Sequence, residues 1–283
     1  MVGQVYKAHS NKYQVKCGEK LYTCGARGVL KIKSDGICVG DFAEFEKGVI
    51  TRVLQRKNRF IRPSVTNVDV IVAVVSPLPK PDFYLIDKLL ISAIKEDVDF
   101  IIAVNKPDID DTLINSVKSE YGSLGFPIIE VSAKNGKGID ELKDMLKGRL
   151  SVLAGQSAAG KTSIINSMFN LDLRTGDLSE KIARGKHTTT RSEIFEFGEY
   201  KIVDSPGFAV IEAMVTLDQL PECYPEYFEV SKDCKFRGCS HVSEPDCKVK
   251  ELVESGKLSK NRYVRYVEIY NEISKRREIY EKD

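Results

Sequence analysis

The stretch Gly155-Gln156-Ser157-Ala158-Ala159-Gly160-Lys161-Thr162 decides how this chain of 283 residues is interpreted. It fits the phosphate-loop pattern G-x-x-x-x-G-K-[ST]. A strand-like apolar segment, 149–154, precedes it, and a helix-like segment that begins at Ser163 follows it, as the motif requires. We therefore expect backbone N–H groups around a phosphate, the Lys161 ammonium on the β- and γ-phosphates, and the Thr162 hydroxyl on Mg²⁺. The alternative, a glycine-rich turn without a ligand, fits this context poorly.

Two segments upstream of this loop predict a guanine pocket. The apolar strand 99–104 ends in Asn105-Lys106-Pro107-Asp108, an N-K-x-D sequence. The Asp108 carboxylate can accept from both N1–H and the exocyclic amine of guanine, a donor pair that adenine lacks. A second strand, 126–131, ends in Ser132-Ala133-Lys134, where backbone N–H groups can meet the guanine oxygen.

Two segments downstream predict the rest of a nucleotide hydrolase. The polar stretch 184–191 contains His187 and Thr189, and a threonine in such a loop can bind Mg²⁺ and the γ-phosphate. A predicted hairpin, 193–203, then leads into Asp204-Ser205-Pro206-Gly207, a D-x-x-G element. Asp204 would hold Mg²⁺ through water, and the Gly207 N–H would reach the γ-phosphate.

The order of these motifs is unusual, because the base-reading segments come before the phosphate loop. With a small β region ahead of them and a Cys/His cluster behind them, the chain resembles the circularly permuted GTPases of the RsgA (YjeQ/YloQ) family. The resemblance covers essentially the whole chain. It implies a bacterial ribosome-dependent GTPase that binds the small ribosomal subunit and its rRNA, assists late maturation, and uses GTP/GDP with Mg²⁺.

The residue after D-x-x-G is Phe208, where many GTPases have a glutamine that orients water. Because phenylalanine cannot hydrogen-bond to water, we expect slow intrinsic hydrolysis that a partner stimulates. His187 is a candidate for orienting the water, and a solvated loop histidine is the competing interpretation.

Residues 1–63 hold short alternating segments between turn residues, which predicts a five-stranded barrel of the OB type. Such barrels often bind oligonucleotides. The basic segment 56–62 is either a solvated linker or a contact to a phosphate backbone. Cys17, Cys24 and Cys38 show no metal-ligand spacing and are interpreted as plain thiols, mostly buried.

Residues 213–283 predict a metal knuckle followed by a helix. Cys234, Cys239, His241 and Cys247 form a Cys₃His set, which is typical of structural zinc. Segment 259–283 is a long helix candidate whose apolar residues form a packing stripe. Because this part follows D-x-x-G directly, we expect a shift of Gly207 to pull on it.

Composition sets the remaining expectations. The net charge of +2 names no polyanion partner, and no apolar run approaches the ~20 residues that span a bilayer. The start has no basic segment followed by an apolar run, so we expect no signal peptide and no membrane partner. Three of the seven cysteines group with a histidine, which favours a reducing compartment and hence a cytoplasmic location; we also expect a monomer. The predicted domains are 1–63 (OB barrel), 64–212 (permuted α/β P-loop GTPase) and 213–283 (zinc-binding α domain). Two alternatives remain: a nucleotide-gated RNA-binding protein with incidental hydrolysis, and a GTPase of tRNA modification.

Overall fold

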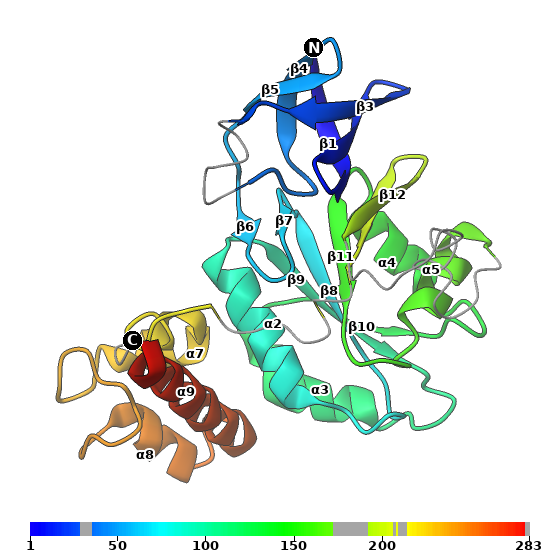
Figure 1. Ribbon diagram of the computed structural model, residues 1–283. Helices are drawn as coiled ribbons and strands as arrows, with labels where there is room; N and C mark the ends of the chain where they lie inside the picture. The colour runs from blue at the N-terminus through cyan, green and yellow to red at the C-terminus, as the bar shows by residue number, and fades with distance from the viewer. Residues whose placement is uncertain (29–35, 172–191, 206–207, 209–213, 281–283) are drawn as a thin grey trace.

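The computed structural model describes residues 1–28, 36–171, 192–205, 208 and 214–280 (Figure 1). The first element is a closed barrel of five strands. β1 pairs with β2 and with β4, β2 with β3, β3 with β5, and β5 with β4, so the order returns to β1. These strands are β1 (Val2–His9), β2 (Lys12–Cys17), β3 (Lys20–Ala26), β4 (Phe42–Glu46) and β5 (Val49–Val53). Their inward side chains, among them Val5, Val15, Phe45 and Ile50, fill the barrel. The predicted OB-type barrel is confirmed.

The central domain is a sheet in the order β10-β9-β8-β11-β13-β12, parallel except for β12. Its strands are β8 (Val70–Val75), β9 (Asp99–Asn105), β10 (Ile128–Val131), β11 (Leu150–Ala154), β12 (Glu193–Phe197) and β13 (Tyr200–Asp204). The helices are α2 (Phe83–Lys95), α3 (Leu113–Tyr121), α4 (Ile139–Leu146) and α5 (Lys161–Phe169), with a short 3₁₀ turn η1 (Gly122–Leu124) after α3.

Strand β8 explains why this sheet is covered on both faces. Its residues Ile71, Ala73 and Val75 pack in one apolar cluster with α2 and α3. The alternating residues Val70, Val72 and Val74 pack in a second cluster with α4 and α5. A strand buried on both faces reads as a continuous apolar run, which is how this segment looks in the sequence.

The C-terminal part is helical and packs against α2. Its elements are η3 (Pro221–Cys223), α7 (Pro225–Ser231), α8 (Lys248–Glu254) and α9 (Lys260–Tyr280). Tyr266 and Ile273 of α9 are buried in a core that also contains Ile91 of α2. The long helix and its packing stripe are therefore as predicted over the described residues.

The connection between the barrel and the central sheet contains the short strands β6 (Arg59–Phe60) and β7 (Val65–Thr66). The basic segment is partly used inside the protein. Arg56 donates from Nε and Nη2 to the fully buried carboxylate of Asp41, at 2.7 and 2.8 Å, and Lys57 pairs with Asp69. Arg56 is thus neither a solvated linker residue nor available to a phosphate.

The barrel also meets the sheet directly. Strand β1 pairs with β12 at Lys7 and Glu193, which joins the two units into one sheet, visible in Figure 1 where β12 lies below β1. Among the residues that the structure describes, no helix is both long and apolar enough to cross a bilayer.

Candidate functional site

The phosphate loop lies between β11 and α5, as the sequence predicts. Gly155 has φ +136°, and a Cβ there would lie 2.2 Å from the carbonyl oxygen of Val74. Gly160 has φ +100°, and a Cβ there would lie 2.2 Å from Nδ2 of Asn105. Both positions therefore require glycine, because any side chain would collide with a neighbouring strand or its terminal residue.

Lys161 and Thr162 begin α5. The Lys161 ammonium donates to the carbonyl oxygens of Gly155 and Gln156, at 2.8 and 2.7 Å, and its burial lowers its pKa. Thr162 is half-buried and Ser163 is exposed. The side chain of Gln156 accepts the N–H of Asp82, the residue that caps α2, at 3.1 Å.

Asp204 ends β13, the strand next to β11. Burial raises the pKa of its carboxyl group, and the Lys161 charge opposes that rise. Because parallel neighbouring strands end at the same edge of the sheet, Thr162 and Asp204 supply oxygen ligands at one place. Oxygen ligands are those that Mg²⁺ prefers, so this donor set fits the metal.

The two segments that the sequence predicts to read guanine contact the phosphate loop. Asn105 Nδ2 donates to the carbonyl oxygen of Ala159 at 3.0 Å, and its Oδ1 accepts the N–H of Ala133 at 3.3 Å. The Lys106 ammonium donates to the carbonyl oxygen of Ala158 at 2.7 Å. The sequence predicts these residues as base-reading groups. Their role as struts to the phosphate loop was missed, because it depends on contacts between distant segments.

Asp108 and Lys134 lie together at the ends of these two segments. The Lys134 ammonium is 3.1 Å from Oδ2 of Asp108, and this hydrogen bond lowers the pKa of the carboxyl group. The Asp108 side chain is 38% exposed, so an ionised carboxylate faces outward where a base can reach it. Pro107 is half-buried, and the buried Ser132 donates its N–H to the carbonyl oxygen of Lys137.

Ala158 adopts φ +62° within the phosphate loop. This left-handed conformation is costly for a residue with a Cβ, by about 1 kcal/mol. The neighbouring contact from Lys106 to its carbonyl oxygen holds it there. The loop therefore stores backbone strain next to the expected phosphate position.

Three predicted catalytic residues, His187, Thr189 and Gly207, lie outside the described residues. Ser192 and Ser205, which flank hairpin β12–β13, are hydrogen-bonded through their hydroxyls at 2.8 Å. Phe208 is 1% exposed, and its ring packs edge-on against Phe60, with ring centroids 5.4 Å apart. Its side chain therefore belongs to the core, which agrees with its inability to orient water.

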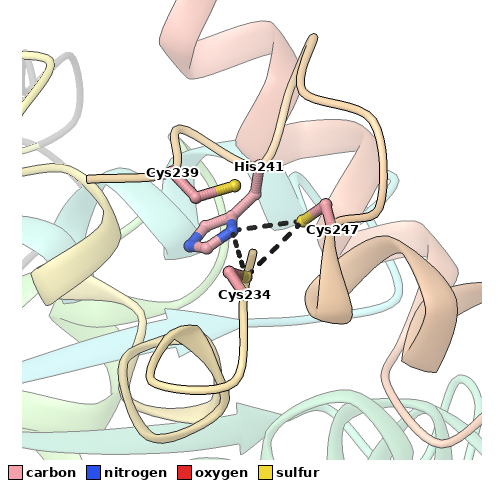
Figure 2. Close-up of side chains that lie close together, drawn as sticks. All are labelled: Cys234, Cys239, His241 and Cys247. Atoms are coloured by element: carbon pink, nitrogen blue, oxygen red, sulfur yellow. Dashed lines mark hydrogen bonds between the residues drawn. The ribbon is translucent and has the colours of Figure 1, made fainter. Parts of the chain in front are cut away.

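The four predicted metal ligands form one compact cluster between α7 and α8 (Figure 2). The His241 Nδ1 atom lies 3.7 Å from the Cys234 sulfur and 3.4 Å from the Cys247 sulfur, and those two sulfurs are 3.9 Å apart. The four ligand atoms all lie within 4.8 Å of one another, with Cys239 completing the set. Zinc bonds of about 2.3 Å to sulfur and 2.1 Å to nitrogen give tetrahedron edges of about 3.6 to 3.8 Å. The cluster therefore fits tetrahedral zinc.

The surroundings of the cluster hold it rigidly. The Tyr263 and Tyr266 hydroxyls of α9 donate to the carbonyl oxygens of His241 and Ser240, at 2.8 and 2.6 Å. Burial raises the pKa of the Cys239 thiol to about 12. A set of buried thiols of this kind is stabilised as thiolates by a bound cation.

A buried ionic network, which the sequence reasoning missed, fastens α9 to the central domain. Arg262 is 1% exposed, and its Nη1 donates to Asp87 of α2 at 2.5 Å. Arg265 also binds Asp87 and reaches Glu120 of α3. The Arg262 guanidinium lies 4.7 Å from the Tyr121 ring centroid, a cation–π contact. No local motif announces these pairs, since their members are separated by about half the chain.

The fold and the site together define a P-loop GTP-binding protein whose base-reading strands precede its phosphate loop in sequence. Comparison with known families agrees: residues 53–214 match the family described as RsgA GTPase, and residues 2–50 match the RsgA N-terminal domain. This chain belongs to the RsgA family.

Individual relatives match over the full chain. A protein of Geobacillus sp. (strain WCH70), named small ribosomal subunit biogenesis GTPase RsgA, is 38% identical, with 98% of this chain and 99% of the relative covered. The crystal structure of YjeQ from Thermotoga maritima has a TM-score of 0.81 at 35% identity, covering 96% and 98% of the two chains. That of YloQ, described as a circularly permuted GTPase, has a TM-score of 0.76 at 28% identity, covering 97% and 95%.

Proposed function

We propose that this protein hydrolyses GTP to GDP and phosphate while bound to the small ribosomal subunit, and so assists late maturation of that subunit. The observation that carries the proposal is the meeting of all described GTPase motifs at one edge of one sheet. The names of its relatives supply the ribosomal partner. A ribosomal partner also supports a cytoplasmic location, and we propose that the protein acts as a monomer.

The guanine end of the pocket selects the nucleotide. Asp108 accepts the two guanine donors. In the protein without nucleotide, the hydrogen bond from Lys134 keeps the carboxyl group ionised. Ser132, Ala133 and Lys134 form the other side, where a bound base would compete with Lys137 and Asn105 for the N–H groups of Ser132 and Ala133. A base without the donor pair leaves the carboxylate unpaired, which is costly when water is excluded.

The phosphate end of the pocket performs the chemistry. The 155–160 backbone and Lys161 would bind the β- and γ-phosphates, and Thr162 and Asp204 would hold Mg²⁺. The metal, when bound, neutralises charge on the phosphates. Because Phe208 is buried, another group must position the attacking water, and we propose His187, with Thr189 as the residue that senses the γ-phosphate.

The two flanking domains have different roles: one binds RNA, and the other is structural. The barrel, proposed as residues 1–63, contacts rRNA, and the zinc-binding domain, proposed as residues 213–283, extends the GTPase domain, 64–212. Zinc on the Cys₃His cluster supplies folding energy for its part of the chain.

The decisive experiment measures GTP turnover with and without purified small ribosomal subunits, together with co-sedimentation in a non-hydrolysable GTP analogue. Stimulation by the subunit of about tenfold or more is expected. Binding without stimulation would favour an RNA-binding protein with incidental hydrolysis, and no binding would favour another pathway such as tRNA modification.

Two substitutions test the residue roles. Asp108→Asn should exchange the preference for GTP for one for xanthosine triphosphate, which offers an acceptor where guanine has an amine. His187→Ala should lower subunit-stimulated turnover by about 100-fold while GTP affinity stays unchanged. Unchanged stimulated turnover in the second variant would remove His187 from the mechanism.

A further inference from the structure

A pocket of about 330 Å³ opens where the barrel meets hairpin β12–β13. Strands β1, β2 and β4 form its barrel side, and β12 and β13 form the other side. The residues that give it chemical character are Gln4, Tyr6, Lys16, Phe42, Glu196 and Lys201. It is separate from the GTP site, and no motif in the sequence points to it.

The charges of this pocket are unbalanced. Glu196 accepts from the Tyr6 hydroxyl at 2.7 Å and forms an ion pair with Lys16. Lys201 donates to the neutral amide oxygen of Gln4 at 2.9 Å and is the cross-strand partner of Glu196, so the two lysines share one carboxylate. These pocket residues therefore carry two positive charges against one negative charge, and an anion is the ligand that would compensate the excess.

Aromatic surface accompanies that charge. Phe42 is 39% exposed at the pocket wall, and strand pairing places it opposite Gln4. The Lys16 and Lys201 ammoniums lie 5.7 and 5.9 Å from the Tyr6 ring centroid, so both cations lie close to one ring. An exposed ring beside excess positive charge is the combination that binds an unpaired nucleotide, with the base stacked and the phosphate paired.

We propose that this pocket binds one unpaired nucleotide of single-stranded RNA, with its phosphate on Lys201 and its base stacked on Phe42. The proposal rests on the proposed function, in which the partner contains RNA, and it names the place of contact. Two of the pocket residues, Glu196 and Lys201, lie on the hairpin that ends at Asp204. An RNA group in the pocket therefore touches the element that positions a magnesium ligand.

The test measures binding of a fluorescein-labelled oligouridine of about ten nucleotides, with GDP saturating so that the guanine site is filled. Phe42→Ala should weaken binding about tenfold at every salt concentration. Lys201→Met should weaken it and lower the slope of log affinity against log salt by about 0.7. The matched controls are Val49→Ala, another exposed apolar residue of the barrel, and Lys12→Met, an exposed lysine at the far end of β2.

Several outcomes would overturn the proposal. The proposal fails if both pocket variants bind the oligonucleotide as tightly as the parent protein, or if the two control variants lose as much affinity as the pocket variants. It also fails if the parent protein does not bind the oligonucleotide. Inorganic phosphate or uridine monophosphate competing as well as the oligonucleotide would show a small-anion site instead. If the pocket variants lose binding to the small subunit but still bind the oligonucleotide, the pocket binds a protein and not RNA. If the parent protein binds RNA but not the small subunit, the proposed function fails and the pocket stands.

Discussion

The barrel and the C-terminal domain both attach to the central domain, and the ion pairs at the two junctions differ in exposure. At the barrel junction β1 pairs with β12, and the Lys16 and Glu196 side chains of one ion pair are 23% and 26% exposed, while Tyr6 and Val39 of the barrel region pack in the central core. The C-terminal junction is an ionic network in which the Arg262 and Asp87 side chains are 2% and 0% exposed. Water can replace the partners of the exposed pair but not those of the buried network.

This difference bears on an expectation about signalling. The sequence predicts that the C-terminal domain, which follows Gly207, is pulled when that glycine moves, and this connection lies outside the described residues. The structure fastens the same domain to α2 and α3, through Asp87 and Glu120. The hairpin that leads to Asp204 contacts the barrel. Changes at the nucleotide therefore have a direct structural route to the barrel.

The largest expected effect comes from removing the metal cluster. Cys247→Ser, or a strong chelator, should abolish zinc binding and expose α8 and α9 to hydrogen exchange, because structural zinc contributes about 10 kcal/mol. Zinc content and exchange over 234–273 measure this. The half-buried Cys17→Ser in the barrel is the control and should retain zinc. Full protection of α9 without zinc would contradict the assignment.

The next effect comes from breaking the buried network. Asp87→Asn leaves two buried arginines without their shared anion, so unfolding in urea should show a loss of about 3–5 kcal/mol. The control Glu229→Gln breaks only the exposed pair with Lys232 and should cost less than about 1 kcal/mol. Equal losses in the two variants would remove the contrast between buried and exposed junctions.

A smaller effect is expected at the barrel junction. Glu196→Gln should cost about 1 kcal/mol near neutral pH. Burial raises the pKa of Glu196, but hydrogen bonds from Lys16 and Tyr6 outweigh burial and lower it below 4.5. The contribution of the carboxylate is therefore complete above pH 4.5 and is lost as the pH falls through the lowered pKa. Urea unfolding of both proteins across this range should show their difference shrinking in acid, and a constant difference would contradict it.

The smallest effect concerns the strained residue of the phosphate loop, which neither junction touches. Ala158→Gly relieves a left-handed conformation but adds freedom to the unfolded chain, so a net stabilisation of about 0.5 kcal/mol is expected. Thermal unfolding measures it. Ala159→Gly, at a buried neighbour, should destabilise by about 1 kcal/mol, because it adds freedom to the unfolded chain and removes a buried methyl group. Destabilisation by both would show that Ala158 is not strained.

Much of this architecture could be predicted because its signals are local. The phosphate loop, the strand endings at Asn105 and Ser132, and the Cys/His spacing each lie within a few residues, and each fixes its own backbone geometry. The barrel followed from alternating apolar residues between turns. These signals survive permutation, since each depends on a strand and its adjoining loop.

The remaining features depend on pairs far apart in the chain. Arg56 looked available to a phosphate until the fold placed Asp41 beside it. Arg262 lies in a helix segment with more basic than acidic residues, and no neighbouring residue indicated that it would be buried as the partner of Asp87. The sequence alone does not show whether a charged side chain contacts solvent, a ligand or another part of the protein, because tertiary packing determines its partner.

The struts from Asn105 and Lys106 to the phosphate loop have a consequence for evolution and design. In the proposed function this pair of side chains supports base selectivity, and in the structure it also holds the phosphate loop. A substitution at Asn105 or Lys106 that changes which nucleotide binds will therefore also change the rate of turnover. Asp108, two residues after Lys106, hydrogen-bonds to Lys134 and makes no hydrogen bond to the phosphate loop among the described residues, so a change there should alter selectivity with less effect on that loop.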